Sequence, residues 1–185
     1  MTRSMKRTGW VIAAFAGGAC AVLAVIALVL AANPPPQQTS LAPWYPAAND
    51  SGDPAFADFE NHVPCAVDDP PSEHCQRVKL GLVLYRDPQS NEPTTYLMSR
   101  IRVGEGDDRE VDRGRWSIGQ GTALDPDATV YRLETGAPEG LDLYWAIGDD
   151  ILFMLDEQGM PRVGDAAYGY ALNRIPLGER TVAPE

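Results

Sequence analysis

The apolar run from Trp10 to Ala32 constrains this chain more than any other feature, because it cannot belong to a water-exposed domain. It reads WVIAAFAGGACAVLAVIALVLAA and contains no charged residue. A helix needs roughly 20 apolar residues to cross a bilayer, so the run predicts one transmembrane helix over residues 10–32. Arg3, Lys6 and Arg7 precede the run, and no basic residue follows it directly. This bias places residues 1–9 in the cytoplasm and the later residues outside it.

Two other interpretations of the apolar run, a cleaved secretory signal and a lipidation signal, fit the sequence less well. A cleaved secretory signal has a shorter apolar core, of about 7–15 residues, although Leu30-Ala31-Ala32 resembles a cleavage site. Lipidation at Cys20 would require the apolar stretch to end there, whereas it continues to Ala32. We therefore expect a single-pass membrane protein whose C-terminal part lies outside the cytoplasm.

The exported part is strongly acidic. All 26 Asp and Glu residues follow residue 32, with 12 of the 15 Lys and Arg residues, so its net charge is about −14. Such a charge repels phosphate backbones, and we expect no nucleic-acid partner. It would favour cations or a basic partner.

Composition divides this part into three segments. Residues 33–55 carry Pro34-Pro35-Pro36 and further prolines, which favours an extended linker. Trp44 and Tyr45 interrupt this linker, and the sequence leaves open whether they meet the membrane interface or the domain. Residues 56–176 have the size of one domain, and residues 177–185 form a tail.

The domain is predicted to be all-β, because apolar residues recur with a period of two and no amphipathic helix stands out. Turn-forming residues separate successive strands, which favours an antiparallel meander, and closure into a barrel would remove exposed edges. The predicted strands cover residues 78–85, 94–103, 114–118, 129–135, 141–147, 151–155 and 168–175.

The order of several short motifs resembles the N-terminal domain of NlpE-like copper-resistance lipoproteins. Val63-Pro64-Cys65-Ala66 is followed by Cys75 and a strand of alternating leucines, then by Gly114-Arg115-Trp116 and by Leu155-Asp156-Glu157-Gln158-Gly159. The resemblance covers residues 56–175. It implies a small lipocalin-like β-barrel in the envelope, with a role in copper tolerance and in reporting stress to a sensor kinase. The chain differs from that family in the nine residues between its cysteines and in its apolar run, which stands in place of a lipid anchor in the outer membrane. With this run, the resemblance implies a single-pass protein of the bacterial inner membrane whose domain lies in the periplasm.

One cluster carries metal-capable side chains: His62, Cys65, His74 and Cys75. Thiolate and imidazole suit Cu(I) or Zn, so these four residues form a candidate metal site for copper or zinc. A disulfide between Cys65 and Cys75 is the favoured alternative, since two exported cysteines separated by a short loop normally pair. The bond and a thiolate metal site exclude each other at any moment.

No catalytic residue is predicted, because no nucleophile–base arrangement or phosphate-binding loop stands out. We therefore expect a non-enzymatic role in envelope stress or copper homeostasis, through contacts with an envelope protein or sensor kinase. A carrier of a small apolar ligand inside the barrel is one alternative, opposed if Leu82, Trp116 and Trp145 fill it. An accessory subunit of a membrane complex, packed through Gly17-Gly18, is another.

Overall fold

The structure is a computed structural model that describes residues 40–41, 43–67, 73–106, 108–177 and 180–181. The expected cytoplasmic segment and transmembrane helix, residues 1–9 and 10–32, lie outside this description. Within the described residues, no helix has the length and apolarity needed to cross a bilayer.

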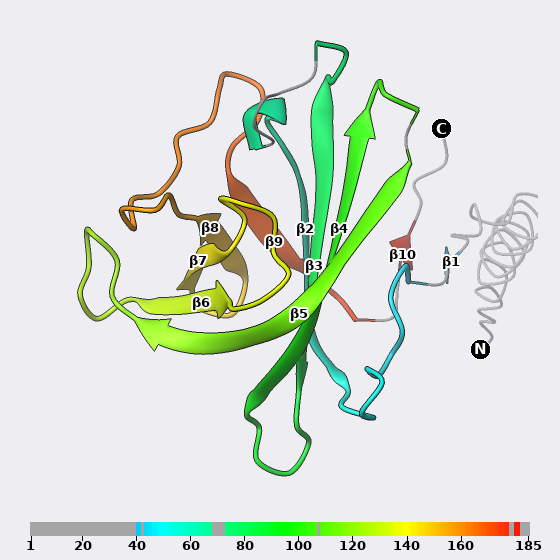
Figure 1. The fold of residues 1–185 in the computed structure, drawn as a ribbon, viewed down its shortest axis with the longest axis vertical. Helices are drawn as coiled ribbons and strands as arrows, with labels where there is room; N and C mark the ends of the chain where they lie inside the picture. Colours follow the sequence, from blue (N-terminus) through cyan, green and yellow to red (C-terminus); the bar gives the residue numbers. More distant parts are fainter. Residues whose placement is uncertain (1–39, 42, 68–72, 107, 178–179, 182–185) are drawn as a thin grey trace, which may run out of the picture. The chain divides into compact units, whose positions relative to one another are not determined.

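The all-β prediction is confirmed, and the domain is a closed antiparallel barrel of eight strands (Figure 1). Each strand pairs with the next along the chain, and β9 pairs with β2 to close the barrel. A short 3-10 turn, η1 (Cys65–Val67), follows β2, and β1 (Ser40–Leu41) pairs with β10 (Arg180–Thr181) in a separate sheet. The barrel strands are β2 (Ala55–Val63), β3 (Arg77–Arg86), β4 (Pro93–Val103), β5 (Arg109–Gln120), β6 (Thr129–Leu133), β7 (Leu143–Ile147), β8 (Ile151–Met154) and β9 (Ala171–Ile175).

Strand β2 was not among the predicted strands, although its sequence alternates. Ala57 and Phe59 face the barrel interior and are nearly inaccessible to solvent, while Asp58 and Glu60 lie on the other face. Phe59 is in register with Leu82 of β3 on one side and Arg174 of β9 on the other. This strand therefore closes the barrel and removes both edges of the sheet.

The barrel interior is filled by side chains. Leu80, Leu82 and Leu84 of β3 face Tyr96 and Met98 of β4, and each of these residues is at most 1% exposed. An eight-stranded barrel is just wide enough for side chains to fill its interior. The buried core continues through β5–β9 with Trp116, Tyr131, Leu133, Tyr144, Leu152, Met154 and Leu172.

Trp145, one of the three residues whose presence in the interior would oppose a carrier role, does not lie there. Tyr144 and Ala146 are the β7 residues in the core, which puts Trp145 on the outer face, where its ring lies 6.4 Å from that of Phe153. The Tyr144 hydroxyl donates a hydrogen bond to the Leu141 carbonyl, 2.9 Å away, so this tyrosine is satisfied when buried. Both faces of β7 carry apolar side chains, with Tyr144 and Ala146 inside and Leu143, Trp145 and Ile147 outside, so the sequence pattern does not show which face is buried.

Arginines cover one end of the barrel. The Arg86 guanidinium lies 3.6 Å from the centre of the Phe56 ring, and Arg174 lies 5.4 Å from the same ring. Arg174 also donates to the Phe56 and Asp149 carbonyls, at 3.1 and 3.3 Å. These contacts join the first and last barrel strands.

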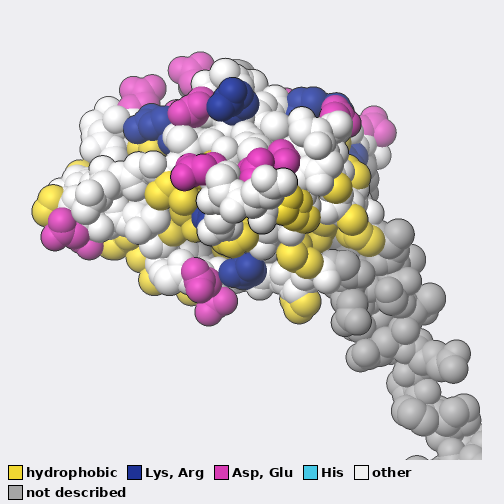
Figure 2. All heavy atoms as spheres, turned by 90° about the horizontal axis from the view of Figure 1, so that it is seen from below, with side chains coloured by type: hydrophobic (Ala, Val, Ile, Leu, Met, Phe, Trp, Pro, Cys, Tyr) yellow, Lys and Arg dark blue, Asp and Glu magenta, His cyan; other side chains and the backbone are white. Residues whose placement is uncertain are grey.

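Elsewhere on the surface, Figure 2 shows acidic side chains scattered over one face rather than gathered in one patch.

Candidate functional site

The predicted disulfide is present. The sulfur atoms of Cys65 and Cys75 are 2.06 Å apart and the Cα atoms 6.0 Å apart. The bond ties η1 to the residues just before β3, and Cys75 packs against the core. In this state neither sulfur is a thiolate, so the expected copper site cannot use them as ligands.

The two histidines do not join the cysteines in a metal site. His62 lies on the outer face of β2, whereas His74 is exposed in the turn that precedes β3. Within the described residues, no group of three or more His, Cys, Asp or Glu side chains is placed to hold a metal ion. Copper binding therefore stays a prediction.

His62 has an unusual environment. Its Nε2 atom is buried and has no hydrogen-bond partner in the described part of the chain. Burial lowers the pKa of His62 below its ordinary value, and the nearby charges of Arg77 and Lys79 lower it further. The imidazole is therefore neutral at neutral pH.

Residues 43–54, which we name the strap, pack on the outer face of the barrel. Tyr45 is 5% exposed and packs against Val83 and Tyr85. The Tyr85 hydroxyl donates to the Pro46 carbonyl at 2.9 Å. Burial raises the pKa of Tyr85 to about 12, with contributions from Tyr45 and Asp58. Part of the expected linker is thus held against the domain.

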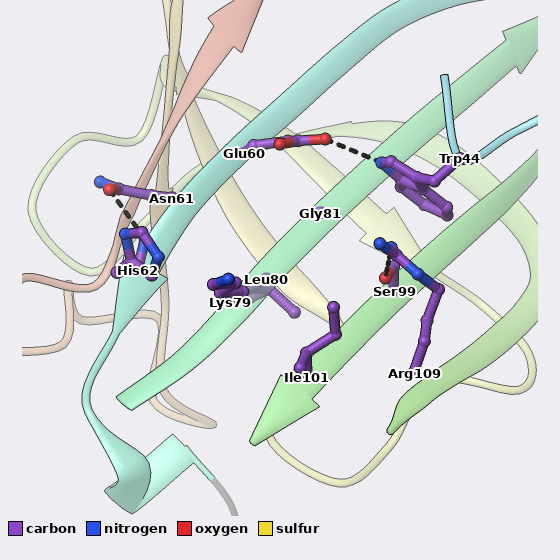
Figure 3. A pocket seen from close by; sticks show the side chains of 10 residues that line it. All are labelled: Trp44, Glu60, Asn61, His62, Lys79, Leu80, Gly81, Ser99, Ile101 and Arg109. Carbon is purple, nitrogen blue, oxygen red and sulfur yellow. Dashed lines mark hydrogen bonds between the residues drawn. The ribbon is translucent and has the colours of Figure 1, made fainter. Parts of the chain in front are cut away.

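Trp44 fixes the strap to the outer face of the sheet, over the middle of β3. Its indole N–H donates to a carboxylate oxygen of Glu60 at 2.7 Å, and the ring covers Gly81 of β3 (Figure 3). A Cβ atom on Gly81 would lie only 2.9 Å from the indole, so only glycine leaves room for it. The Arg109 guanidinium lies 5.3 Å from the ring and also donates to the Ser99 hydroxyl.

An open cavity of about 220 Å³ lies beside this tryptophan, and we name it the Trp44 cavity. Figure 3 shows Trp44 and Arg109 on one side of Gly81 and His62 on the other. The basic side chains that line the Trp44 cavity, His62, Lys79 and Arg109, come from three different strands, so no local sequence motif indicates the cavity. The lining residues are Trp44, Glu60, Asn61, His62, Lys79, Leu80, Gly81, Ser99, Ile101 and Arg109.

The sequence leaves open whether Trp44 and Tyr45 contact the domain, and one signal favours that contact. Gly81 interrupts an apolar strand, and a glycine inside a strand often marks a close approach by another segment. Trp44 and Tyr45 are large aromatic residues in a proline-rich stretch that otherwise lacks core formers. Together these features predict a contact, although the pairing between them does not follow from the sequence.

Comparison of the chain with known family models, with curated proteins and with solved structures finds no match. The resemblance to NlpE-like lipoproteins therefore stays a prediction from the motifs.

Proposed function

We propose that this chain is a non-enzymatic envelope protein, anchored by residues 10–32 in the inner membrane, whose barrel acts in the periplasm in the envelope stress response. The observation that carries the proposal is the disulfide between Cys65 and Cys75. Structural disulfides persist in oxidising compartments and are rare in the cytosol. The bond therefore supports export of the domain, in agreement with the orientation expected from the basic N-terminus.

The filled barrel supports an interaction role over a carrier role. Leu82 and Trp116 occupy the interior with exposures of 0% and 2%, alongside the other core side chains. A ligand there would have to displace close-packed residues, at a cost of several kcal/mol. We therefore place the function on the outer surface and on the loop that the disulfide closes, where a sensor kinase or another envelope protein would make contact.

A copper role would require reduction of the disulfide. Copper ions favour thiolate ligands, and these become available at Cys65 and Cys75 only when the bond is broken. We therefore propose stress reporting as the main function, with copper handling confined to the reduced state.

The test compares a host that lacks this chain with the same host complemented by wild type or by Cys65→Ser/Cys75→Ser. The readouts are an envelope-stress reporter and growth in copper, and Cys20→Ser is the matched single-cysteine control. We expect the deletion and the double variant to change the stress response, and Cys20→Ser to behave as wild type. An unchanged response in the deletion strain would refute the proposal.

A second measurement addresses the compartment. Thiol alkylation of the full chain in intact cells, read as a mass shift, reports whether Cys65 and Cys75 are bonded in the host. Protection of both cysteines until a reductant is added is expected. Immediate labelling of both by a membrane-permeant reagent would contradict the periplasmic location.

A further inference from the structure

A second, larger cavity lies between the strap and the outer face of β4 and β5, and we name it the arginine cavity. Its volume is about 350 Å³, within the range of small-molecule sites. The sheet lines it with apolar side chains such as Leu97 and with Arg113 and Arg115, and the strap lines it with Pro46 and with the polar residues Asn49 and Asp50.

The strap wall of this cavity is held in place. The Asn49 side-chain amide donates to the Thr95 hydroxyl of β4 and to the Asp53 carboxylate, both at 2.8 Å. Its carbonyl oxygen accepts from the backbone N–H groups of Ser51 and Asp53, both at 2.9 Å. One side chain thus closes the loop and fastens it to the sheet. The cavity is therefore formed before any ligand arrives, which lowers the entropic cost of binding.

Two arginines on the opposite wall have no partner in the described part of the chain. Arg113 and Arg115 lie on the outer face of β5, in register with Leu97 and Thr95, and both are exposed. No ion pair, hydrogen bond or ring contact engages either guanidinium within the described residues. In a chain of net charge −11, two adjacent arginines that acidic neighbours leave unpaired are conspicuous.

We propose that the arginine cavity binds a small organic carboxylate with a flat apolar body. The planar guanidinium matches a carboxylate in a bidentate geometry, so Arg113 and Arg115 would hold the charged end. The apolar body would rest on Leu97 and Pro46, beside the rigid Asn49 loop. A neutral analogue lacks the charge, and a cationic one is repelled. The site is thus selective for acids, and it lies outside the barrel rather than within it.

The experiment uses the full chain in lipid nanodiscs and follows para-fluorobenzoate by fluorine NMR, with empty nanodiscs as the blank. We expect saturable binding in the millimolar range, as is usual for so small a ligand. Arg113→Gln/Arg115→Gln should weaken binding about tenfold or more, because charge-assisted hydrogen bonds are lost. Arg132→Gln, an exposed arginine of β6 that does not line the cavity, should bind as wild type.

Two further measurements distinguish specific binding of the carboxylate from nonspecific adsorption. Para-fluorobenzyl alcohol should bind at least about tenfold more weakly than the acid, since it cannot form the ionic pair. Asn49→Ala should weaken binding with both arginines intact, because the wall loosens. Equal binding of acid and alcohol, or unchanged affinity in the double arginine variant, would overturn the proposal. Absence of saturable binding by the wild type would overturn it as well.

Discussion

Substitution of Gly81 by alanine tests how the strap is held on the barrel. The three atoms nearest to the added methyl group would all belong to Trp44, whose indole Cζ2, Cε2 and Nε1 atoms would lie 2.9, 3.3 and 3.4 Å away. The ring is rigid and is held by its bond to Glu60, so it must leave its place. We therefore expect Gly81→Ala to release the strap while the barrel stays folded.

The size of the effect follows from the contact that is lost. Loss of the hydrogen bond from Trp44 to the Glu60 carboxylate costs about 1.5–3 kcal/mol, and the lower end applies because the pair is only partly buried. The higher strand propensity of alanine does not offset this loss, because β3 stays folded whether the strap is closed or open. We expect strap opening to become easier by about 1.5 kcal/mol. In a Trp44→Ala background, where the clash is absent, the same change should leave strap opening unchanged.

The assay is hydrogen–deuterium exchange of strap amides in the full chain. Asn49 and Ala55 are the reporters, since their N–H groups bond to the Asp53 and Ala47 carbonyls at 2.9 Å. Gly119→Ala is the matched control, because its added methyl group would meet no atom closer than 3.9 Å.

Equal effects of the glycine substitution with and without Trp44 would refute this account of the strap. Their difference is the interaction energy of the pair, and we expect it to be about 1.5 kcal/mol.

Three other predictions concern the bond, the tyrosines and the barrel end. Reduction of the Cys65–Cys75 disulfide, which closes a separation of 10 residues, should lower the free energy of unfolding by about 2.7 kcal/mol in chemical denaturation, and an unchanged midpoint would contradict this. The pKa of Tyr85 is raised to about 12, so the neutral hydroxyl is favoured in the folded state; stability should fall as pH rises from about 10 to 12. Tyr85→Phe should flatten that fall in alkaline unfolding curves, and an identical slope would count against the burial of the hydroxyl. Arg174→Met should lower the melting temperature by several degrees, through loss of two hydrogen bonds and a ring contact, whereas no change would show that this end needs no arginine.

Some strands could be predicted closely because their two faces differ. Residues 78–85 and 94–103 alternate over many positions. Strand β3 extends beyond the first range by one residue at each end, and β4 extends beyond the second by one residue at its start. Strand β5 is harder, since Glu110 and Asp112 face inward and meet Arg100 in ion pairs at 3.0 and 3.2 Å. Polar residues then occupy both faces, and the period-two signal disappears. The sequence therefore predicts only residues 114–118 of this strand, whereas β5 covers Arg109–Gln120.

The candidate sites also differ in how far the sequence predicts them. The pairing of Cys65 with Cys75 follows from compartment and spacing, both readable from the sequence. The two cavities do not, because each combines the strap with strands far along the chain. Arg109 reaches the Trp44 ring only through the register of β3, β4 and β5, and that register depends on every hairpin in between. Side chains brought together by topology leave no local motif.

The strap explains why both cavities lie outside the barrel. The interior is filled by core residues, and the two cavities form where the strap crosses the convex outer wall of the barrel. Trp44 borders one cavity and the Asn49 loop borders the other. Release of Trp44 would therefore open the first cavity and loosen the wall of the second. Carboxylate binding at Arg113 and Arg115 should accordingly weaken in Gly81→Ala but not in Gly119→Ala, and equal affinity in the two variants would show that the cavities are independent.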